Sequence, residues 1–355
     1  MKKIAVLEGD GIGPEVMQEA LKILDIISNK TNIKFNYDKG LVGAAAIDSD
    51  GNPFPESTKK LCSNSDAILF GAIGDPKYDN DPKAKVRPED GLLEMRKFLG
   101  LYANVRPVIT YDSLLDSSPL KKEIVSGTNF VVYRELTGGI YFGEKSISDD
   151  RRSAYDTCFY NIDEIERISH LAFKEAKKRK KELTLVDKAN VLDTSRLWRE
   201  VVQKISISYP EVKVSYLFVD NAAMKIITNP TDFDVILTEN MFGDIITDEA
   251  SVITGSLGML PSASVGDKIS LYEPIHGSYP QAAGKGIANP MAMILSLSMM
   301  LDLSFNLKKE SEIILKSVED ALKENVVTMD INNKKYLSTS EVGDWISNKV
   351  TDYLV

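Results

Sequence analysis

The chain has 355 residues, of which 43% are hydrophobic and 27% are charged, a composition typical of a globular protein that is too long for one small core. We therefore expect two domains. The chain has 43 Lys and Arg against 52 Asp and Glu, and its net charge of −9 disfavours broad attraction to nucleic acid or to anionic lipid. An anionic ligand would have to be held by a local cluster of basic side chains.

The cysteine content and the apolar tracts favour a cytoplasmic protein. The two cysteines, Cys62 and Cys158, lack the spacing of a zinc or redox motif, and an extracellular chain of this size often carries a disulfide framework. The longest apolar tract, Met291–Leu301, is too short to span a bilayer. We expect no membrane segment, no targeting segment and no nucleic-acid partner.

Short β-rich runs alternate with longer helical patterns, which predicts an α/β fold. The helical patterns have apolar stripes that begin at Val16, Ile165 and Leu197, and Ser338 with Glu341 predicts a capping box at the last helix. The stretch Asp75 to Asp90, rich in Pro, Asp and Lys, is expected to be a mobile loop. The predicted strands are Lys3–Leu7, Lys34–Tyr37, Ala67–Gly71, Phe130–Glu135, Leu183–Val186, Val214–Phe218 and Val235–Thr238.

Two glycine-rich segments could cradle a phosphate. Gly9–Pro14 follows a strand and precedes a helix, but its third glycine falls one place early for GxGxxG, so a tight turn without a ligand is an equally good interpretation. Gly284–Pro290 precedes a strongly helical stretch and follows His276, so it is a second candidate.

Asp244 and Asp248 lie four residues apart in a segment, Phe242–Thr254, that is predicted to be helical, so both carboxylates would project from one face. Oxygen ligands without nearby His or Cys suit Mg²⁺ or Mn²⁺, although a solvated acidic turn is the commoner explanation of such a pair. Asp220 follows an apolar run, where it could line a site at a strand end or cap a helix.

Basic and phenolic side chains interrupt apolar sequence at several points. Arg96, Arg106 and Arg134 could bind a dicarboxylate bidentately or could pair with structural carboxylates. Tyr141 lies among glycines that would let a ligand approach, or it is a core tyrosine. Lys188 directly follows a predicted strand, at the carboxyl end where parallel sheets place active sites, and a desolvated lysine can act as a base.

Taken together, these segments resemble the isocitrate/isopropylmalate family of β-decarboxylating dehydrogenases nearly from end to end. The motifs that carry the resemblance are EGDGIGPEV (8–16), RPEDGLLEMRKFLGLYANVRPV (87–108), RELTGGIYFG (134–143), DKANVL (187–192), TENMFGDIITDEAS (238–251), GSLGMLPSAS (255–264), EPIHGS (273–278) and GKGIANP (284–290).

The resemblance implies a two-domain α/β fold with a mixed central sheet that is not a Rossmann fold. Residues 1–101 and 255–355 would form the first domain, on the cofactor side, and residues 102–254 a second domain with the metal site and the dimer contact. The implied partners are NAD, Mg²⁺ or Mn²⁺, a small dicarboxylate and a second copy of the chain.

The resemblance also implies a role for each site residue. Arg96, Arg106 and Arg134 would grip the carboxylates of the substrate, Asp244 and Asp248 would hold the metal, and Asp220 and Lys188 would reach in from the other subunit. Lys188 would take the hydroxyl proton as hydride leaves for nicotinamide, and Tyr141 would protonate the enol carbon after CO₂ is lost. Further substrate contacts are expected from Glu89, Leu92, Leu93, Asn190 and Val191, and cofactor contacts from Gly74, Glu273, His276, Gly277, Gln281, Ala282, Gly284 and Asn289.

The expected reaction is oxidation of (2R,3S)-3-isopropylmalate to 4-methyl-2-oxopentanoate in leucine biosynthesis. Leu92, Leu93 and Val191 would form an apolar wall for the isopropyl group, because burying its carbons is worth about 0.8 kcal/mol each, whereas a carboxylate there would lose its hydration. Isocitrate, homoisocitrate or tartrate are the alternative substrates. A catalytically silent dinucleotide-binding regulatory subunit is a further alternative, but its expected loss of a catalytic residue is not seen.

One segment departs from the family pattern. Where the family typically has Ala-Pro-Asp-Ile, this chain has Tyr279, Pro280, Gln281 and Ala282. Gln281 can hydrogen-bond a ribose hydroxyl but lacks the negative charge that repels a 2′-phosphate. We therefore expect a weaker preference for NAD over NADP than an aspartate would give.

Overall fold

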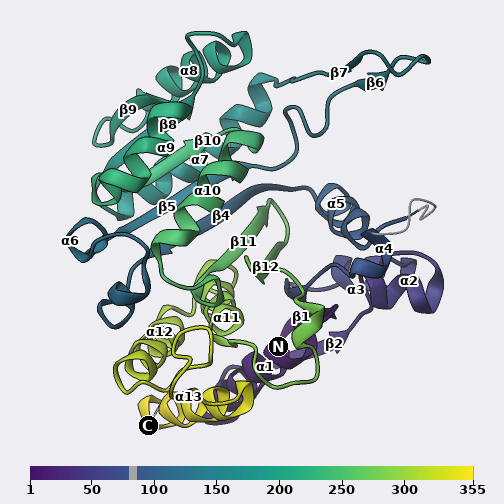
Figure 1. The fold of residues 1–355 in the computed structure, drawn as a ribbon, viewed down its shortest axis with the longest axis vertical. Helices are drawn as coiled ribbons and strands as arrows, with labels where there is room; N and C mark the ends of the chain where they lie inside the picture. Colours follow the sequence, from purple (N-terminus) through teal and green to yellow (C-terminus); the bar gives the residue numbers. More distant parts are fainter. Residues whose placement is uncertain (80–85, 355) are drawn as a thin grey trace. The chain divides into compact units, whose positions relative to one another are not determined.

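The computed structural model describes residues 1–79 and 86–354. The chain divides into two compact units: unit 1 is Met1–Leu101 with Ser256–Val355, and unit 2 is Tyr102–Gly255. Each unit contains a mixed section of β-sheet covered by helices, as expected for an α/β fold of this family. Both chain termini belong to unit 1 (Figure 1).

The sheet section of unit 1 has the strand order β2-β1-β3-β12-β11. β1 pairs in parallel with β2 and β3, β12 pairs in parallel with β3, and β11 is antiparallel to β12. The first strand is rich in Ile, Ala, Val and Leu because it is buried on both faces. The strands are β1 (Lys2–Gly9), β2 (Phe35–Lys39), β3 (Ala67–Ala72), β11 (Pro261–Gly266) and β12 (Ser270–Pro274).

Helices of unit 1 form two groups. α1, α11, α12 and α13 pack on one another, and Figure 1 shows them as neighbours. A second group packs on the core cluster that contains Leu7, Phe70 and Leu271 on the strands with Cys62 and Met95 on helices. The helices are α1 (Gly13–Lys30), α2 (Ala44–Asp50), α3 (Glu56–Ser63), α4 (Pro76–Asp79), α5 (Pro88–Leu99), η3 (Leu257–Met259), η4 (Pro280–Ala282), α11 (Met291–Leu303), α12 (Lys308–Lys323) and α13 (Thr339–Tyr353).

The sheet section of unit 2 has the order β4-β5-β10-β8-β9, in which β4 is antiparallel to β5 and the other pairs are parallel. The carboxyl ends of β5, β8 and β10 therefore meet at one edge, where polar side chains from three separate segments can gather. The strands are β4 (Leu101–Ile109), β5 (Asn129–Glu135), β6 (Lys145–Ile147), β7 (Ala154–Asp156), β8 (Glu182–Asp187), β9 (Lys213–Phe218) and β10 (Val235–Thr238).

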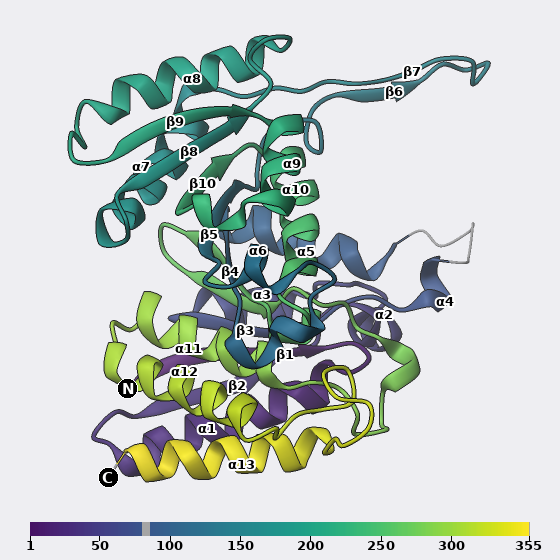
Figure 2. The same cartoon turned by 60° about the vertical axis from the view of Figure 1, so that its left-hand side comes forward.

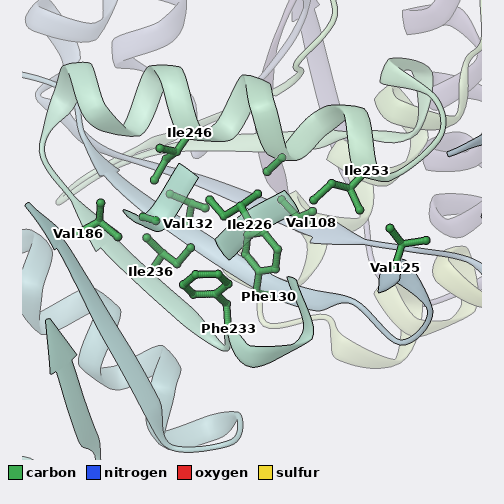
Figure 3. Packing of buried hydrophobic residues seen from close by; sticks show 12 residues of the cluster. Val108, Val125, Phe130, Val132, Val186, Ile226, Phe233, Ile236, Ile246 and Ile253 are labelled. Carbon is green, nitrogen blue, oxygen red and sulfur yellow. The ribbon is translucent and has the colours of Figure 1, made fainter. Parts of the chain in front are cut away.

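The core of unit 2 holds α9 and α10 against this section. Phe130 and Val132 of β5 and Ile236 of β10 pack with Ile226 of α9 and Ile246 of α10, and all five side chains are buried (Figure 3). Alternate residues of the same strands point to the other face, where α7 contacts β5, β8 and β10. The helices are η1 (Asp112–Ser117), α6 (Lys122–Val125), α7 (Ile162–Lys178), α8 (Asp193–Ser206), α9 (Val219–Thr228), η2 (Pro230–Asp232) and α10 (Asn240–Ile253).

A two-stranded antiparallel arm, β6 with β7, extends away from the rest of unit 2 (Figures 1 and 2). All residues of both strands are exposed in the single chain, including Ile147 and Tyr155. The sequence pattern predicted neither strand, since three residues are too few for an alternation to be recognised.

Several local predictions are confirmed and others are wrong. The capping box of Ser338 with Glu341 forms at the start of α13. The predicted loop from Asp75 to Asp90 instead contains α4 and the beginning of α5, and residues 80–85 lie outside the described part of the chain. Among the residues that the structure describes, no helix is long and apolar enough to cross a bilayer.

Candidate active site

The centre of the site in unit 2 is the guanidinium of Arg134 at the end of β5. Its Nε and Nη2 donate to Oδ1 of Asn240 at 3.0 and 2.9 Å, and its Nη1 donates to Oδ1 of Asp244. Asn240 and Asp244 lie one turn apart on α10, so these two acceptors of the Arg134 guanidinium lie on one face of the helix. Gly243 makes room for the arginine stem, because a Cβ there would lie 2.6 Å from Cγ of Arg134.

Tyr141 lies in the turn that follows β5, and its hydroxyl donates to Oδ2 of Asp244 at 3.0 Å. Partial burial raises the pKa of Tyr141, and the neighbouring carboxylate of Asp244 raises it further. The phenol, protonated at neutral pH even without this shift, thus lies as a donor beside Asp244. It is available as a general acid next to the carboxylate that the sequence assigns to the metal.

Arg106 on β4 forms a second link to α10. Its Nη1 donates to Oγ1 of Thr247 at 2.8 Å and to Oδ1 of Asp248 at 3.2 Å, while its Nε donates to Oδ1 of Asn104 at 2.7 Å. The arginine side chain is 12% exposed and that of Asp248 is 72% exposed. A largely buried cation therefore faces a carboxylate that solvent and ligands can reach.

Lys188 and Asp220 form a separate ion pair. Lys188 follows β8, Asp220 lies in the first turn of α9, and Nζ lies 2.5 Å from Oδ1. Asp220 follows the end of β9 by two residues, so it does lie at a strand end, whereas it is not the helix cap, because Phe218 occupies that position. The hydrogen bond from Lys188 lowers the pKa of Asp220.

Two polar contacts hold the turn that carries Lys188. Asp187 is buried at the end of β8 and accepts from Nε and Nη2 of Arg199 at 2.5 and 3.0 Å. The backbone N–H of Lys188 donates to Oγ of Ser195 at 3.0 Å. The next predicted site residues, Asn190 and Val191, are exposed, and the side chain of Val191 is 61% exposed.

The predicted metal carboxylates do not gather within one chain. Throughout residues 1–79 and 86–354, no group of three or more His, Cys, Asp or Glu is arranged to hold a metal ion. Asp244 and Asp248 are brought together on α10, whereas Asp220 pairs with Lys188.

In unit 1, the predicted substrate arginine and a predicted cofactor residue meet. Nη2 of Arg96, near the end of α5, lies 3.3 Å from Oε1 of Glu273 on β12, and both side chains are largely buried. Glu89 is exposed in the first turn of the same helix. Leu92 packs partly on the core of unit 1, whereas Leu93 is 46% exposed. Of the two leucines expected to form an apolar wall, Leu93 is the one that presents its side chain to solvent.

The segment Gly9–Pro14 is a tight turn that organises its surroundings. The carboxylate of Asp10 is 6% exposed and accepts from the N–H groups of Ala44, Ala45 and Gly74 at 2.9 to 3.0 Å. Burial raises the pKa of Asp10, and these three N–H groups oppose that shift. The N–H groups of Asp10, Ile12 and Gly13 themselves donate to backbone carbonyl oxygens of the chain. The turn therefore holds the loop of Gly74, a predicted cofactor residue, and these three amides are already paired.

The second glycine-rich segment is also engaged within the chain. The N–H groups of Gly284 and Gly286 donate to the carboxylate of Glu15, the latter at 3.1 Å. Hence Glu15 occupies the cradle that the sequence offered to a phosphate. A Cβ at either glycine would meet nothing within 4 Å, so the outer side of the segment is open.

The remaining predicted cofactor residues surround this segment. Gln281 is exposed, Ala282 is buried, and Asn289 is buried with Nδ2 donating to Asp330 at 3.1 Å. Nδ1 of His276 lies 3.0 Å from the carbonyl oxygen of Gly277, and its buried Nε2 has no hydrogen-bond partner in the part of the chain that the structure describes. Burial lowers the pKa of His276, so the ring is neutral at pH 7.

Sequence reasoning missed the polar residues that hold this machinery in place. Asn240 and Glu135 lie beside the predicted catalytic groups of unit 2, and Glu15 and Asp10 organise the loops of unit 1. Glu135 is immediately next to Arg134, but proximity in sequence alone does not distinguish a site residue from a solvated acid.

Comparisons with known proteins show which family model, relatives and solved structures this chain matches. The family model described as isocitrate/isopropylmalate dehydrogenase matches residues 3–346. A 3-isopropylmalate dehydrogenase of Bacteroides fragilis is 55% identical over 346 residues, which are 97% of this chain and 97% of that protein. A 3-isopropylmalate dehydrogenase of Aquifex aeolicus is 53% identical over 349 residues, covering 97% of this chain and 96% of that protein.

Solved structures agree with the fold. The crystal structure of isocitrate dehydrogenase from Methylococcus capsulatus has a TM-score of 0.88 and 30% identity, covering 99% of this chain and 100% of that one. The crystal structure of a β-decarboxylating dehydrogenase from Thermococcus kodakarensis has a TM-score of 0.83 and 34% identity, covering 99% of this chain and 97% of that one.

Proposed function

Because the chain belongs to the isocitrate/isopropylmalate dehydrogenase family, we propose that it oxidises (2R,3S)-3-isopropylmalate and decarboxylates it to 4-methyl-2-oxopentanoate while reducing NAD, the leucine-biosynthesis reaction. The observation that carries the substrate is the 55% identity, over 97% of both chains, to a protein named 3-isopropylmalate dehydrogenase. The clustering of Arg106, Arg134, Tyr141, Asp244 and Asp248 in unit 2 supports the same chemistry.

The arginines supply the dicarboxylate site. Arg134 and Arg106 have planar forks that match carboxylate geometry, and each is already ordered by a neutral partner, Asn240 or Asn104. Arg96 is proposed as a third substrate cation. Leu92, Leu93 and Val191 are proposed to line the pocket of the isopropyl group, with Glu89 and Asn190 as polar neighbours.

The donor set of α10 fits a hard divalent cation. Asp244 and Asp248 offer carboxylate oxygens without His or Cys, which suits Mg²⁺ or Mn²⁺, and family members are dehydrogenases that need a divalent metal. Asp220 is proposed as the third ligand. The metal, when bound, would make the substrate hydroxyl more acidic and would stabilise negative charge that develops on its oxygen.

Two residues of the chain move the protons. Lys188 is proposed to accept the hydroxyl proton as a neutral amine, which requires that the ammonium seen here first give up its proton and its pairing with Asp220. Transfer of hydride from the same carbon to NAD would then give a β-keto acid. When the bond to the carboxylate breaks and CO₂ leaves, its electron pair would remain as an enolate, and Tyr141 is proposed to donate its proton to the enolate carbon, giving the 2-oxo acid. The geometry supports this role, because the hydroxyl of Tyr141 lies 3.0 Å from Oδ2 of the proposed metal ligand Asp244.

We propose that the site is shared between two copies of the chain, with unit 2 as the dimer contact. Two observations support this: Lys188 and Asp220 form an ion pair of their own, and the described residues of one chain contain no three-carboxylate cluster. A second copy that supplied Lys188 and Asp220 beside Asp244 and Asp248 would complete the set.

Unit 1 is proposed to hold NAD. Gly277, Gly284 and Gly286 leave open space for a ligand at the backbone, and the partnerless Nε2 of His276 can accept a hydrogen bond from it. Gly74, Glu273, Gln281, Ala282 and Asn289 complete the proposed set. The free thiols of Cys62 and Cys158 fit a reducing cytoplasm as the location.

The test is an assay of nicotinamide reduction with NAD and with NADP, each with 3-isopropylmalate, isocitrate, homoisocitrate or tartrate and with or without Mg²⁺. We expect Mg²⁺-dependent reduction of NAD with 3-isopropylmalate, accompanied by one CO₂ per NADH. Faster turnover of isocitrate than of 3-isopropylmalate would mean that the chain is one of the isocitrate dehydrogenases of its family. Binding of NAD without turnover of any substrate would favour a regulatory subunit.

A further inference from the structure

Asn240 is a buried amide between two parts of the proposed site. It is the first residue of α10 and is 1% exposed. Its Oδ1 accepts both Nε and Nη2 of Arg134, and its Nδ2 donates to the carbonyl oxygen of Gly138 at 3.1 Å. One side chain therefore contacts the proposed substrate cation and the turn that leads to Tyr141.

The backbone of Gly138 and Gly139 packs closely against the ring of Tyr160. A Cβ at Gly138 would lie 2.7 Å from Cε1 of that ring, and a Cβ at Gly139 would lie 2.4 Å from its hydroxyl. The same hydroxyl accepts the backbone N–H of Asn240 at 2.9 Å. The start of α10 and the turn before Tyr141 are thus tied together at two points.

A second polar contact holds the near side of the turn. The carboxylate of Glu135 is completely buried and accepts the N–H groups of Thr137 and Gly138 at 2.7 to 2.9 Å. Glu135 fixes the N–H side of the turn and Asn240 fixes its carbonyl side. Of these two side chains, Asn240 is the one that also accepts hydrogen bonds from Arg134.

We propose that Asn240 is a positioning residue for the reaction: it holds the guanidinium of Arg134 ready for a substrate carboxylate and holds the turn that places the hydroxyl of Tyr141. The inference deepens the proposed function and rests on it. A neutral amide suits the position, because it offers an acceptor to the arginine and a donor to the carbonyl without adding a charge that would compete with the substrate.

The first test is a pair of double-mutant cycles in the dimeric, Mg²⁺-loaded protein. Asn240→Ala should raise KM for 3-isopropylmalate about tenfold, since a hydrogen bond to a charged group is lost. If Asn240 acts through Arg134, adding Asn240→Ala to Arg134→Lys should raise KM no more than about twofold further. In the second cycle, Asn240→Ala should lower kcat less when it is added to Tyr141→Phe than when it is introduced into the wild-type protein. Effects that multiply in both cycles would overturn the proposal.

The second test does not depend on activity. Hydrogen exchange in the substrate-free protein should become at least about fivefold faster over residues 137–143 in Asn240→Ala, because the carbonyl of Gly138 loses its donor. Asn240→Asp also loses that donor, so it should show the same faster exchange, and its KM should rise as well because the added carboxylate competes with the substrate for Arg134. Unchanged exchange in both variants would contradict the proposal.

Asp234→Asn is the matched control. Asp234 is 1% exposed, precedes the opposite end of β10, and accepts Nε of Arg179 at 2.8 Å. This variant should lower the thermal midpoint while leaving exchange over 137–143 and KM within twofold of the wild type. Should the wild-type protein fail to oxidise 3-isopropylmalate, the proposed function fails, whereas the exchange measurement still decides whether Asn240 holds the turn.

Discussion

The ammonium of Lys188 lies 2.5 Å from Oδ1 of Asp220, and this contact joins the turn after β8 to the first turn of α9. The hydrogen bond from Lys188 lowers the pKa of Asp220 below its ordinary value. Within one chain the pair contains a proposed base and a proposed metal ligand but neither Asp244 nor Asp248. Several expectations about catalysis depend on this separation.

Lys188→Met should reduce oxidation of 3-isopropylmalate by about a hundredfold to ten-thousandfold, because general-base catalysis typically contributes factors of this size. Binding of NAD and substrate should remain measurable by calorimetry, since the proposed arginine contacts persist. Tyr141→Phe should instead slow the step after CO₂ loss. Wild-type turnover by Lys188→Met across the pH range would show that another group is the base.

Mixing two inactive variants tests the shared site. If Lys188 and Asp220 complete a site on the partner, a dimer of one Asp244→Asn chain and one Lys188→Met chain has one site with both lesions and one with neither. Activity should therefore return after subunit exchange, toward one quarter of the wild-type value for random pairing.

Homodimers that are cross-linked before mixing are the control and should stay inactive. Were each site built from a single chain, every site of the mixed dimer would carry one lesion. An inactive mixture in which native mass spectrometry detects heterodimers would thus refute the shared site.

The cofactor preference should respond to Gln281. Neither Gln281 nor the buried Ala282 supplies a cation for a 2′-phosphate, so kcat/KM should be higher for NAD than for NADP. Gln281→Asp should widen the ratio, since a carboxylate repels the phosphate and accepts both ribose hydroxyls. An unchanged ratio would place the ribose elsewhere, and equal values in the wild type would remove the predicted preference.

Gly243→Ala should weaken both the packing of Arg134 and the binding of substrate. Alanine in a helix is favoured over glycine by about 1 kcal/mol, so the intrinsic preference is stabilising. The added Cβ would nevertheless lie 2.6 Å from Cγ and 2.8 Å from Cβ of Arg134, and the arginine stem must move. We expect KM for 3-isopropylmalate to rise at least tenfold and the thermal midpoint to fall, because the overlapped atoms are the Cβ and Cγ of a buried arginine and β5 and α10 must move apart to relieve the clash. An unchanged KM would show that Arg134 is not a substrate contact.

Cys62 should be unreactive in the native protein. It is completely buried in the core of unit 1, and burial raises its pKa to about 12. At pH 8 about one thiol in 10⁴ would be ionised, and the thiolate is the nucleophile. Titration with an aromatic disulfide should therefore detect Cys158 at most in the native protein and both cysteines in denaturant. Native labelling of Cys62 at the rate of a free thiol would mean that α3 opens readily.

Local sequence patterns were sufficient where the physical cause is local. The helix of Val16 to Ile27 follows from its apolar stripe, and the capping box of Ser338 and Glu341 needs only residues three apart. Strands β11 and β12 were not predicted, since Pro, Ser and Gly interrupt their short apolar runs and pairing with each other stabilises them.

By itself, the sequence determined the α/β class and the family, because reactive residue types at fixed spacings in several ordered motifs are readable without coordinates. The same motifs predict the roles of Lys188, Tyr141 and Asp244. Only the tertiary structure decided what surrounds them. Asn240 meets Arg134 across 106 residues, and Glu15 meets Gly286 across 271. Such contacts form where strands and helices from distant segments pack together. A buried amide or carboxylate must be hydrogen-bonded, and the partners that the fold places beside it decide what it can do.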